Sequence, residues 1–226
     1  MHPGGKYCMT QISVSEWRAT LPRALFTLLL SCLFAVLPIG CTTLGTPSLS
    51  ERLQALPAGQ KDRVYPFFIN SPLDVPQAGR LAGVASYFRE SGFKHSDFLF
   101  RSSGPILADR IREIKQREPG ARIALIAWSG ASLWVWDALT DLHESGASVE
   151  LIVYLDSNWI KERVAEKDHP ANFDRAVLIY RQDNPPVTGV PGSVPRIVAT
   201  NQHLAVAAHA DTVGFLGEEL IRLTVN

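Results

Sequence analysis

From residue 63 onward, short apolar runs alternate with stretches in which apolar residues recur at helical spacing. The helical stretches are Ala78–Ser91, Pro105–Gln116, Ala131–Glu144 and Ala210–Leu223. The apolar runs, each suited to a buried strand, are Arg63–Ile69, Ser96–Phe100, Arg122–Ala127, Val149–Leu155, Arg175–Tyr180 and Arg196–Thr200. Strands that alternate with helices in this way predict βαβ units and a parallel sheet covered on both faces. We therefore expect an α/β fold in which residues 63–226 form one doubly wound domain with a mainly parallel sheet of about six strands.

A different pattern precedes this domain. Residues Ala24–Gly40 carry no charge, and Arg18 and Arg23 lie just before them. A basic flank followed by a short apolar run is typical of an export signal. We expect residues 1–40 to be a signal peptide or membrane anchor. Residues 41–62, rich in Ser, Thr, Pro and Gly, are predicted to be a flexible tether.

The apolar run ends in Leu37-Pro-Ile-Gly-Cys41. This ending resembles the lipobox of bacterial lipoproteins, although Pro38 stands where that pattern usually has Leu. The resemblance implies that Cys41 is lipidated after cleavage. The alternatives are a plain signal peptide and an uncleaved anchor. All three predict a domain outside the cytoplasm, in the cell envelope, either membrane-anchored through its N-terminal segment or periplasmic.

Composition limits which partners, metals and cofactors the protein is expected to bind. The 226 residues include 22 basic and 22 acidic side chains, so no excess of positive charge favours a nucleic-acid partner. The three cysteines all lie at or before residue 41, which leaves the folded domain without disulfides or a thiolate zinc site. No Gly-rich phosphate loop follows the first strand. We expect neither a metal nor a cofactor.

The strongest local motif is Ala127-Trp-Ser-Gly-Ala131, placed between a buried strand and a helix. It resembles the nucleophile elbow of α/β hydrolases, with Ala in the two positions where that family usually has Gly. Residues Ala121–Asp156 resemble the thioesterase-like branch of the family. The resemblance implies that Ser129 is a nucleophile held on a sharp turn and that the Gly130 N–H binds an oxyanion. Otherwise, Ser129 would be an ordinary helix N-cap.

A serine nucleophile needs a base and an orienting acid, which in this family follow it along the chain. His203, after the last strand, is the favoured base and His209 is the alternative. His169 stands in a polar loop and is expected to be solvated. Asp156 and Asp183 both follow strands and compete for the role of the acid; the Leu155-Asp156 pair favours Asp156.

A second oxyanion donor is expected from the loop after the first strand, where Ser71 lies. That loop lacks the Gly-rich run of lipases. The leading hypothesis is an exported serine hydrolase that acts on a small-molecule ester or thioester through an acyl-enzyme, with Ser129, His203 and Asp156 as its triad. The alternative is a catalytically inactive, membrane-tethered binding or scaffold module of the same fold.

Overall fold

The computed structural model describes residues 47–225 apart from residue 101. The predicted signal or anchor at 1–40, the lipidation site Cys41 and the first residues of the predicted tether lie outside the described residues. Within the described part, every helix is too short or too polar to cross a bilayer.

The sheet has six strands in the order β2-β1-β3-β4-β5-β6, and all neighbouring pairs are parallel. The prediction of a doubly wound α/β domain is therefore confirmed. The strands are β1 (Val64–Ile69), β2 (Asp97–Leu99), β3 (Arg122–Trp128), β4 (Val149–Leu155), β5 (Phe173–Arg181) and β6 (Val194–Val198). Every residue of β1 is buried, as expected for a strand that is covered on both faces.

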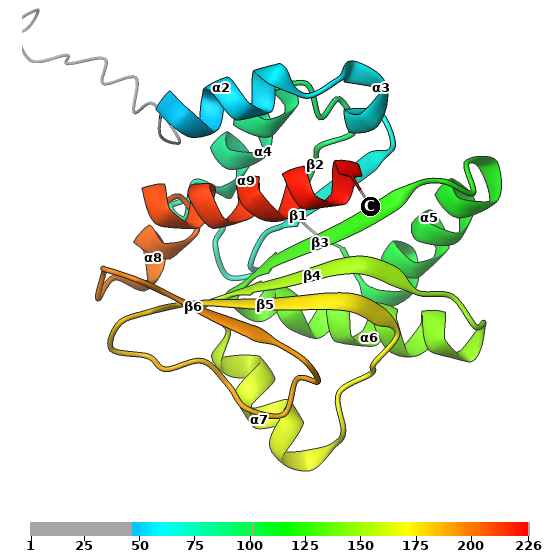
Figure 1. Cartoon of the computed structure of the whole chain (residues 1–226). Helices are drawn as coiled ribbons and strands as arrows, with labels where there is room; N and C mark the ends of the chain where they lie inside the picture. Colours follow the sequence, from blue (N-terminus) through cyan, green and yellow to red (C-terminus); the bar gives the residue numbers. More distant parts are fainter. Residues whose placement is uncertain (1–46, 101, 226) are drawn as a thin grey trace, which may run out of the picture. The chain divides into compact units, whose positions relative to one another are not determined.

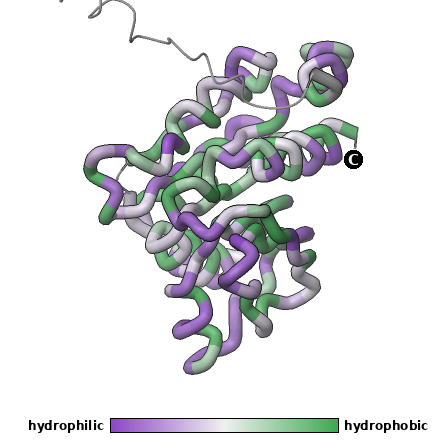
Figure 2. The backbone as a smooth tube through the Cα atoms, turned by 90° about the vertical axis from the view of Figure 1, so that its left-hand side faces the viewer, coloured by the Kyte–Doolittle hydropathy of each residue, from purple (hydrophilic) through white to green (hydrophobic). Residues whose placement is uncertain are grey.

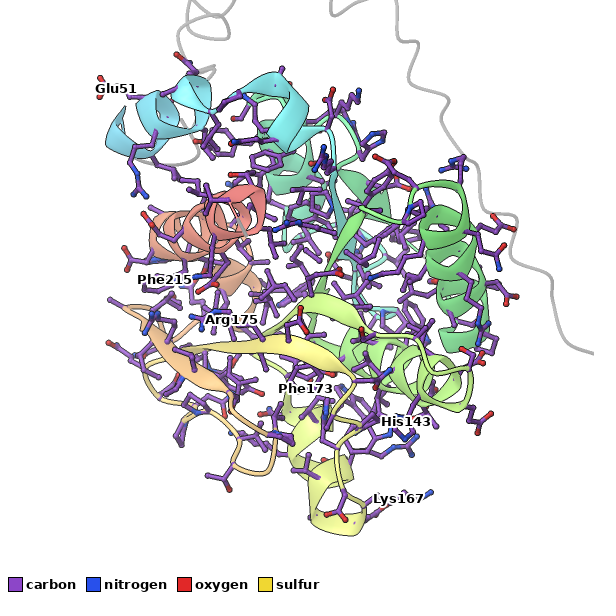
Figure 3. The ribbon with its side chains drawn as sticks, turned by 45° about the vertical axis from the view of Figure 1, so that its right-hand side comes forward. Glu51, His143, Lys167, Phe173, Arg175 and Phe215 are labelled. Carbon is purple, nitrogen blue, oxygen red and sulfur yellow. The ribbon has the colours of Figure 1, made fainter. Side chains whose placement is uncertain are left out.

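Helices cover both faces of this sheet (Figure 1). On one face, α5 (Gly104–Arg117) and α6 (Ser132–Glu144) bury Leu107, Ile111 and Leu139 in a core with side chains from the strands. On the other face, α4 (Leu81–Glu90) and α9 (Ala210–Val225) contribute Phe88 and Leu216 to a second core. Side chains fill the space between the layers (Figure 3). The sheet thus separates two apolar cores.

The prediction of a flexible tether is wrong for residues 47–61. Residues Pro47–Ala55 form α2, and Ala58–Lys61 form the short α3. Leu53 is fully buried, and Leu49 packs so closely on α9 that a Cβ built at Gly217 would lie 2.5 Å from Leu49 Cδ1. The polar and Gly-rich composition of the predicted tether hid the apolar residues Leu49 and Leu53. They are four residues apart, which is about one turn of helix.

The carboxyl ends of the parallel strands form one rim of the sheet. The segments that follow β1, β3 and β4 all begin there, and two short helices border it: α7 (Asn158–Glu166) and α8 (His203–Val206). In Figure 1, α8 lies at this end of the sheet, and Figure 2 views the molecule from that side, with hydrophilic and hydrophobic residues interleaved along the helices. In open α/β sheets, ligands bind at this rim.

His169 is buried, contrary to the expectation of a solvated loop residue. Its Nδ1–H donates to the carbonyl of Pro170 at 2.6 Å, so Nε2 accepts from the Tyr154 hydroxyl at 2.9 Å. Trp136 and Phe173 pack against the ring in T-shaped, edge-to-face geometry. Burial lowers the pKa of His169 to about 4, and the bond to Pro170 only partly opposes this. The imidazole is therefore a neutral core group.

This burial predicts a loss of stability in mild acid. Unfolded His169 takes up a proton below pH about 6.5, whereas the folded ring resists protonation until about pH 4. The free energy of unfolding should therefore fall as the pH drops from 6.5 to 4, with up to about 3 kcal/mol due to this group. Urea titrations across this range should give a shallower pH dependence for His169→Phe than for the wild type. His143→Gln, which changes an exposed histidine, serves as the control. Equal slopes in all three proteins would contradict the assignment.

Candidate active site

Ser129 stands on the sharp turn that the sequence predicts. It follows β3 directly, has φ of 54°, and begins a 3-10 turn (Ser129–Ala131) that runs into α6. Left-handed backbone is unfavourable for a residue with a Cβ, and the structure holds it in place. The Ser129 carbonyl accepts hydrogen bonds from Ser132 Oγ at 2.7 Å and Ser157 Oγ at 3.0 Å. The two hydroxyls are also in contact with each other, and since each has a single proton, one can donate to the carbonyl while the other donates to its neighbour.

Small residues around Ser129 allow the turn to pack closely. Ala127 and Ala131 are fully buried. A Cβ at Gly130 would lie 3.2 Å from Cδ of Pro72 and 3.5 Å from Nε1 of Trp159. A side chain at residue 130 would therefore press on both the loop after β1 and the start of α7. The lack of space around the turn thus explains why small residues surround this serine.

Asp156 occupies the equivalent position on the neighbouring strand. Parallel pairing places Trp128 opposite Leu155, so Ser129 and Asp156 leave β3 and β4 at the same level of the rim. Asp156 also has a left-handed backbone, with φ of 44°, and its side chain is fully buried. Two strained residues side by side at the rim are typical of a functional site.

Three side chains donate to the Asp156 carboxylate. His203 Nδ1 lies 2.6 Å from Oδ2, Arg181 Nη1 lies 2.9 Å from the same oxygen, and Asn184 Nδ2 lies 2.5 Å from Oδ1. Asn184 is itself fixed by Lys161, whose Nζ donates to its Oδ1 at 2.5 Å. The buried carboxylate is therefore fully partnered.

These contacts decide the ionisation of Asp156. Burial by itself would raise its pKa, because a low-dielectric setting disfavours the charged form. The hydrogen bonds from His203 and Asn184, with the charges of His203 and Arg181, outweigh burial and hold the pKa below its usual value. Asp156 is a carboxylate at neutral pH, and a carboxylate only accepts hydrogen bonds. His203 therefore carries a proton on Nδ1, and Nε2 is unprotonated in the neutral ring.

The imidazole of His203 is held from a second side by Trp128, the residue before the candidate nucleophile. The two rings stack with centroids 5.2 Å apart and an interplanar angle of 27°. Trp128 is buried, and its indole also lies against Gly79, where a Cβ would come within 2.4 Å of Cζ3. His203 is the first residue of α8 rather than part of an open loop. One tryptophan thus joins the Ser129 turn to the segment that carries the histidine.

The structure does not bring the alternative residues to this carboxylate or this turn. Asp183 is exposed and accepts from Arg181 Nε at 2.8 Å. His209 contacts Asp211, with Nδ1 accepting from the Asp211 N–H at 3.2 Å. Asp156 and His203 are therefore the acid–imidazole pair of this rim.

Ser71 lies in the loop after β1 and is buried. Its hydroxyl accepts a long hydrogen bond from the Leu73 N–H at 3.4 Å, and its carbonyl accepts from the Asp74 N–H at 3.1 Å. Asp74 in turn accepts from the N–H groups of Ala78 and Gly79. Because the neighbouring Pro72 lies against Gly130, the two predicted oxyanion donors are on facing segments.

One expected contact is not made. Among the described residues, neither the Ser129 hydroxyl nor Nε2 of His203 takes part in a hydrogen bond. The catalytic roles of Ser129, Asp156, His203, Gly130 and Ser71 therefore stay predictions. Hydrogen bonds between a nucleophile and its base often tighten only when a substrate is bound.

Sequence reasoning missed Arg181 and Asn184. Arg181 ends β5, so its place at the carboxyl rim was a signal that could have found it. Asn184 lies in a loop among Pro and Asp residues, and nothing in its local pattern distinguishes it. Within residues 47–100 and 102–225, no group of His, Cys, Asp and Glu side chains is arranged to hold a metal ion.

Comparisons with known proteins add little. No family model matches the chain, and no curated protein sequence matches it. One solved structure similar to this chain is the crystal structure of a covalent complex of the NocB thioesterase domain with a fluorophosphonate nocardicin G analog. The two chains are 15% identical, the match covers 75% of this chain and 97% of that one, and the TM-score is 0.43. The fold assignment above rests on the strand order and register of this chain.

The partners of Asp156 generate a prediction about Arg181. Arg181→Gln removes a positive charge from Oδ2, so the pKa of Asp156 should rise toward its usual value. The measurement is a pH titration of the side-chain carboxyl resonance of Asp156 by ¹³C NMR. Arg63→Gln, at an exposed position before β1, should leave that titration unchanged. An unchanged pKa in Arg181→Gln would show that the ion pair does not govern this carboxylate.

Proposed function

We propose that this protein is a serine hydrolase that cleaves an ester or thioester through an acyl-enzyme on Ser129. One observation carries the proposal: the Asp156 carboxylate accepts a 2.6 Å hydrogen bond from Nδ1 of His203, directly beside the strained turn at Ser129. An imidazole oriented by a buried carboxylate next to a partly exposed hydroxyl on a sharp turn is the arrangement that nucleophilic catalysis by serine requires.

In the first step, the Ser129 hydroxyl attacks the carbonyl carbon of the substrate. As the Oγ–C bond forms, the hydroxyl proton passes to Nε2 of His203, the nitrogen that the bond to Asp156 leaves unprotonated. Asp156 remains ionised and stabilises the imidazolium that forms. This transfer requires Oγ and Nε2 to come within hydrogen-bond distance of each other when the substrate is bound.

The carbonyl oxygen becomes an oxyanion in the tetrahedral intermediate. The backbone N–H groups of Gly130 and Ser71 stabilise its negative charge. The intermediate collapses when the bond to the leaving group breaks and Nε2 returns its proton to that group. Water then repeats the sequence on the acyl-enzyme, with His203 as base, and releases the acid and free Ser129.

The surroundings of Gly130 favour an apolar acyl group. Leu73 and Val75 follow Pro72 in the loop that contacts Gly130, and their side chains are 76% and 64% exposed. Trp159, which also approaches Gly130, is 43% exposed. Exposed apolar side chains that gather beside a candidate site mark a ligand-binding surface rather than packing.

The N-terminal sequence supports a location in the cell envelope. We propose that residues 1–40 direct export and that lipidation of Cys41 anchors the domain to a membrane. Several acyl chains on one cysteine hold a protein stably at a bilayer, whereas a single chain binds only marginally.

The nucleophile is tested by covalent labelling. A fluorescent fluorophosphonate should label the folded protein, because it reacts with activated serines. Ser129→Ala should abolish labelling, and His203→Ala or Asp156→Asn should slow it by about a thousandfold or more. Ser132→Ala is less informative because it removes a brace, so Ser102→Ala, a partly buried serine before α5, is the matched control. Absence of labelling in wild-type protein with a native circular dichroism spectrum would favour a binding or scaffold module instead.

The anchor is tested separately by following the lipid. When the full chain is expressed in a bacterium with radiolabelled palmitate, the wild type should become labelled and sediment with membranes. Cys41→Ser should lose the label, whereas Cys32→Ser should keep it. An unlabelled wild-type protein, or label retained in Cys41→Ser, would exclude lipidation at this residue.

A further inference from the structure

A surface pocket is lined by Gln202 and Leu204, the two chain neighbours of His203. It has a volume of about 460 Å³ and is bordered by residues of the loop before α4 and of the segment from α8 to the start of α9. We call it the Arg80 pocket; the residues that matter here are Ala78, Arg80, Gln202, Leu204 and His209. Gln202 and Leu204 flank His203 in the chain.

Trp128 ties this pocket to the candidate active site. Gly79, between Ala78 and Arg80, lies against the Trp128 indole, and the same indole stacks with the His203 ring. The two walls of the pocket are therefore the two segments that Trp128 holds. Asp74 fixes the first wall by accepting from the N–H groups of Ala78 and Gly79 at 2.7 and 3.2 Å.

Two polar side chains of the pocket, Arg80 and Gln202, bring to it hydrogen-bond donors that are unpaired among the described residues. In the part of the chain that the structure describes, the Arg80 guanidinium and the Gln202 side-chain amide make no hydrogen bond or ion pair. His209 Nδ1 accepts from the Asp211 N–H, so the proton of the neutral ring is on Nε2. Two acids lie near the pocket without lining it: Asp211, 3.6 Å from His209 Nδ1, and Asp74, which accepts hydrogen bonds from the N–H groups of Ala78 and Gly79.

The helix N-termini at the pocket add partial positive charge to that of the Arg80 guanidinium. Arg80 directly precedes α4, and the pocket includes Ala210, the first residue of the long helix α9. The N-terminus of a helix carries a partial positive charge that favours anions. Together with a free guanidinium, this makes the pocket suited to a carboxylate or phosphate, while Ala78 and Leu204 provide an apolar wall for a short chain.

We propose that the Arg80 pocket binds an anionic group on the leaving group of the substrate. This inference rests on the proposed hydrolase. A leaving group must contact Nε2 of His203 to receive its proton, whereas the acyl group lies toward Gly130 and its apolar surroundings. The substrates are therefore esters or thioesters of a short alcohol or thiol that bears a carboxylate or a phosphate, with Arg80 as the specificity-determining residue.

The experiment compares a carboxylate leaving group with its neutral amide of nearly the same shape, and adds a phosphate of similar chain length. S-butyryl-3-mercaptopropionate carries a carboxylate, S-butyryl-3-mercaptopropionamide replaces it with a neutral amide, and S-butyryl-2-mercaptoethyl phosphate tests the phosphate. The rate of thiol release at several substrate concentrations gives kcat/KM for each thioester. The wild type should prefer one of the anionic thioesters over the amide by about tenfold or more, as expected for charge-assisted hydrogen bonds. The anionic thioester that is cleaved faster shows whether the natural leaving group bears a carboxylate or a phosphate.

The matched variants are Arg80→Gln and Arg63→Gln, which make the same change at exposed positions at opposite ends of the strands. Arg80→Gln should bring the ratio of anionic to neutral kcat/KM to about one, and Arg63→Gln should keep the wild-type ratio. A wild-type ratio near one, an equal loss on all thioesters in Arg80→Gln, or a lost preference in Arg63→Gln would overturn the proposal.

Binding separates this proposal from the hydrolase itself. Calorimetry on Ser129→Ala should detect binding of the preferred anionic thioester, and adding Arg80→Gln should remove it. If the wild type cleaves none of the three thioesters and is not labelled by fluorophosphonate, while Ser129→Ala binds an anionic thioester in an Arg80-dependent way, the pocket proposal is supported and the hydrolase proposal is contradicted. If the wild type cleaves anionic and neutral thioesters equally well and binding in calorimetry does not depend on Arg80, the hydrolase proposal is supported and the pocket proposal is contradicted.

Discussion

The site is organised around a negative charge that is buried out of contact with water. Placing a lone carboxylate in a protein interior costs several kcal/mol, so Asp156 is tolerated only because donors surround it. Those donors come from separate parts of the chain: Arg181 from the end of β5, Asn184 from the following loop, and His203 from α8. Satisfying one charge therefore fixes the relative positions of β4, β5 and the segment after β6.

The same requirement limits what the imidazole can do. Since Oδ2 of Asp156 accepts from both Arg181 and His203, the acid is shared between a permanent cation and a base that becomes cationic during attack. Arg181 keeps the acid ionised, and it also repels the imidazolium that forms on His203. The site thus combines a well-oriented histidine with weaker stabilisation of its charged form than an unshared carboxylate would provide.

Much of this arrangement could be predicted from the sequence. The apolar runs located all six strands: the central ones are buried and have a continuous apolar pattern, and the edge strands β2 and β6, although only partly buried, contain short apolar runs as well. Small residues around Ser129 and the position of Asp156 after β4 predicted the turn and its neighbour, since both follow from local sequence and strand order. Long-range contacts could not be predicted in this way. The two anchors of α2, the burial of His169 and the donors Arg181 and Asn184 depend on what lies opposite them in the fold.

Adjacent positions in the loop before α4 experience very different constraints. Gly79 has no room for even a methyl group, because the indole that supports His203 occupies that space. Arg80, one residue further, is exposed, and its guanidinium makes no hydrogen bond or ion pair within the described part of the chain. Mutational drift at residue 80 can therefore alter ligand preference while leaving the reaction machinery intact, whereas residue 79 is held to glycine. A position that can vary to change substrate preference and a position that must stay constant for the reaction are thus joined by a single peptide bond.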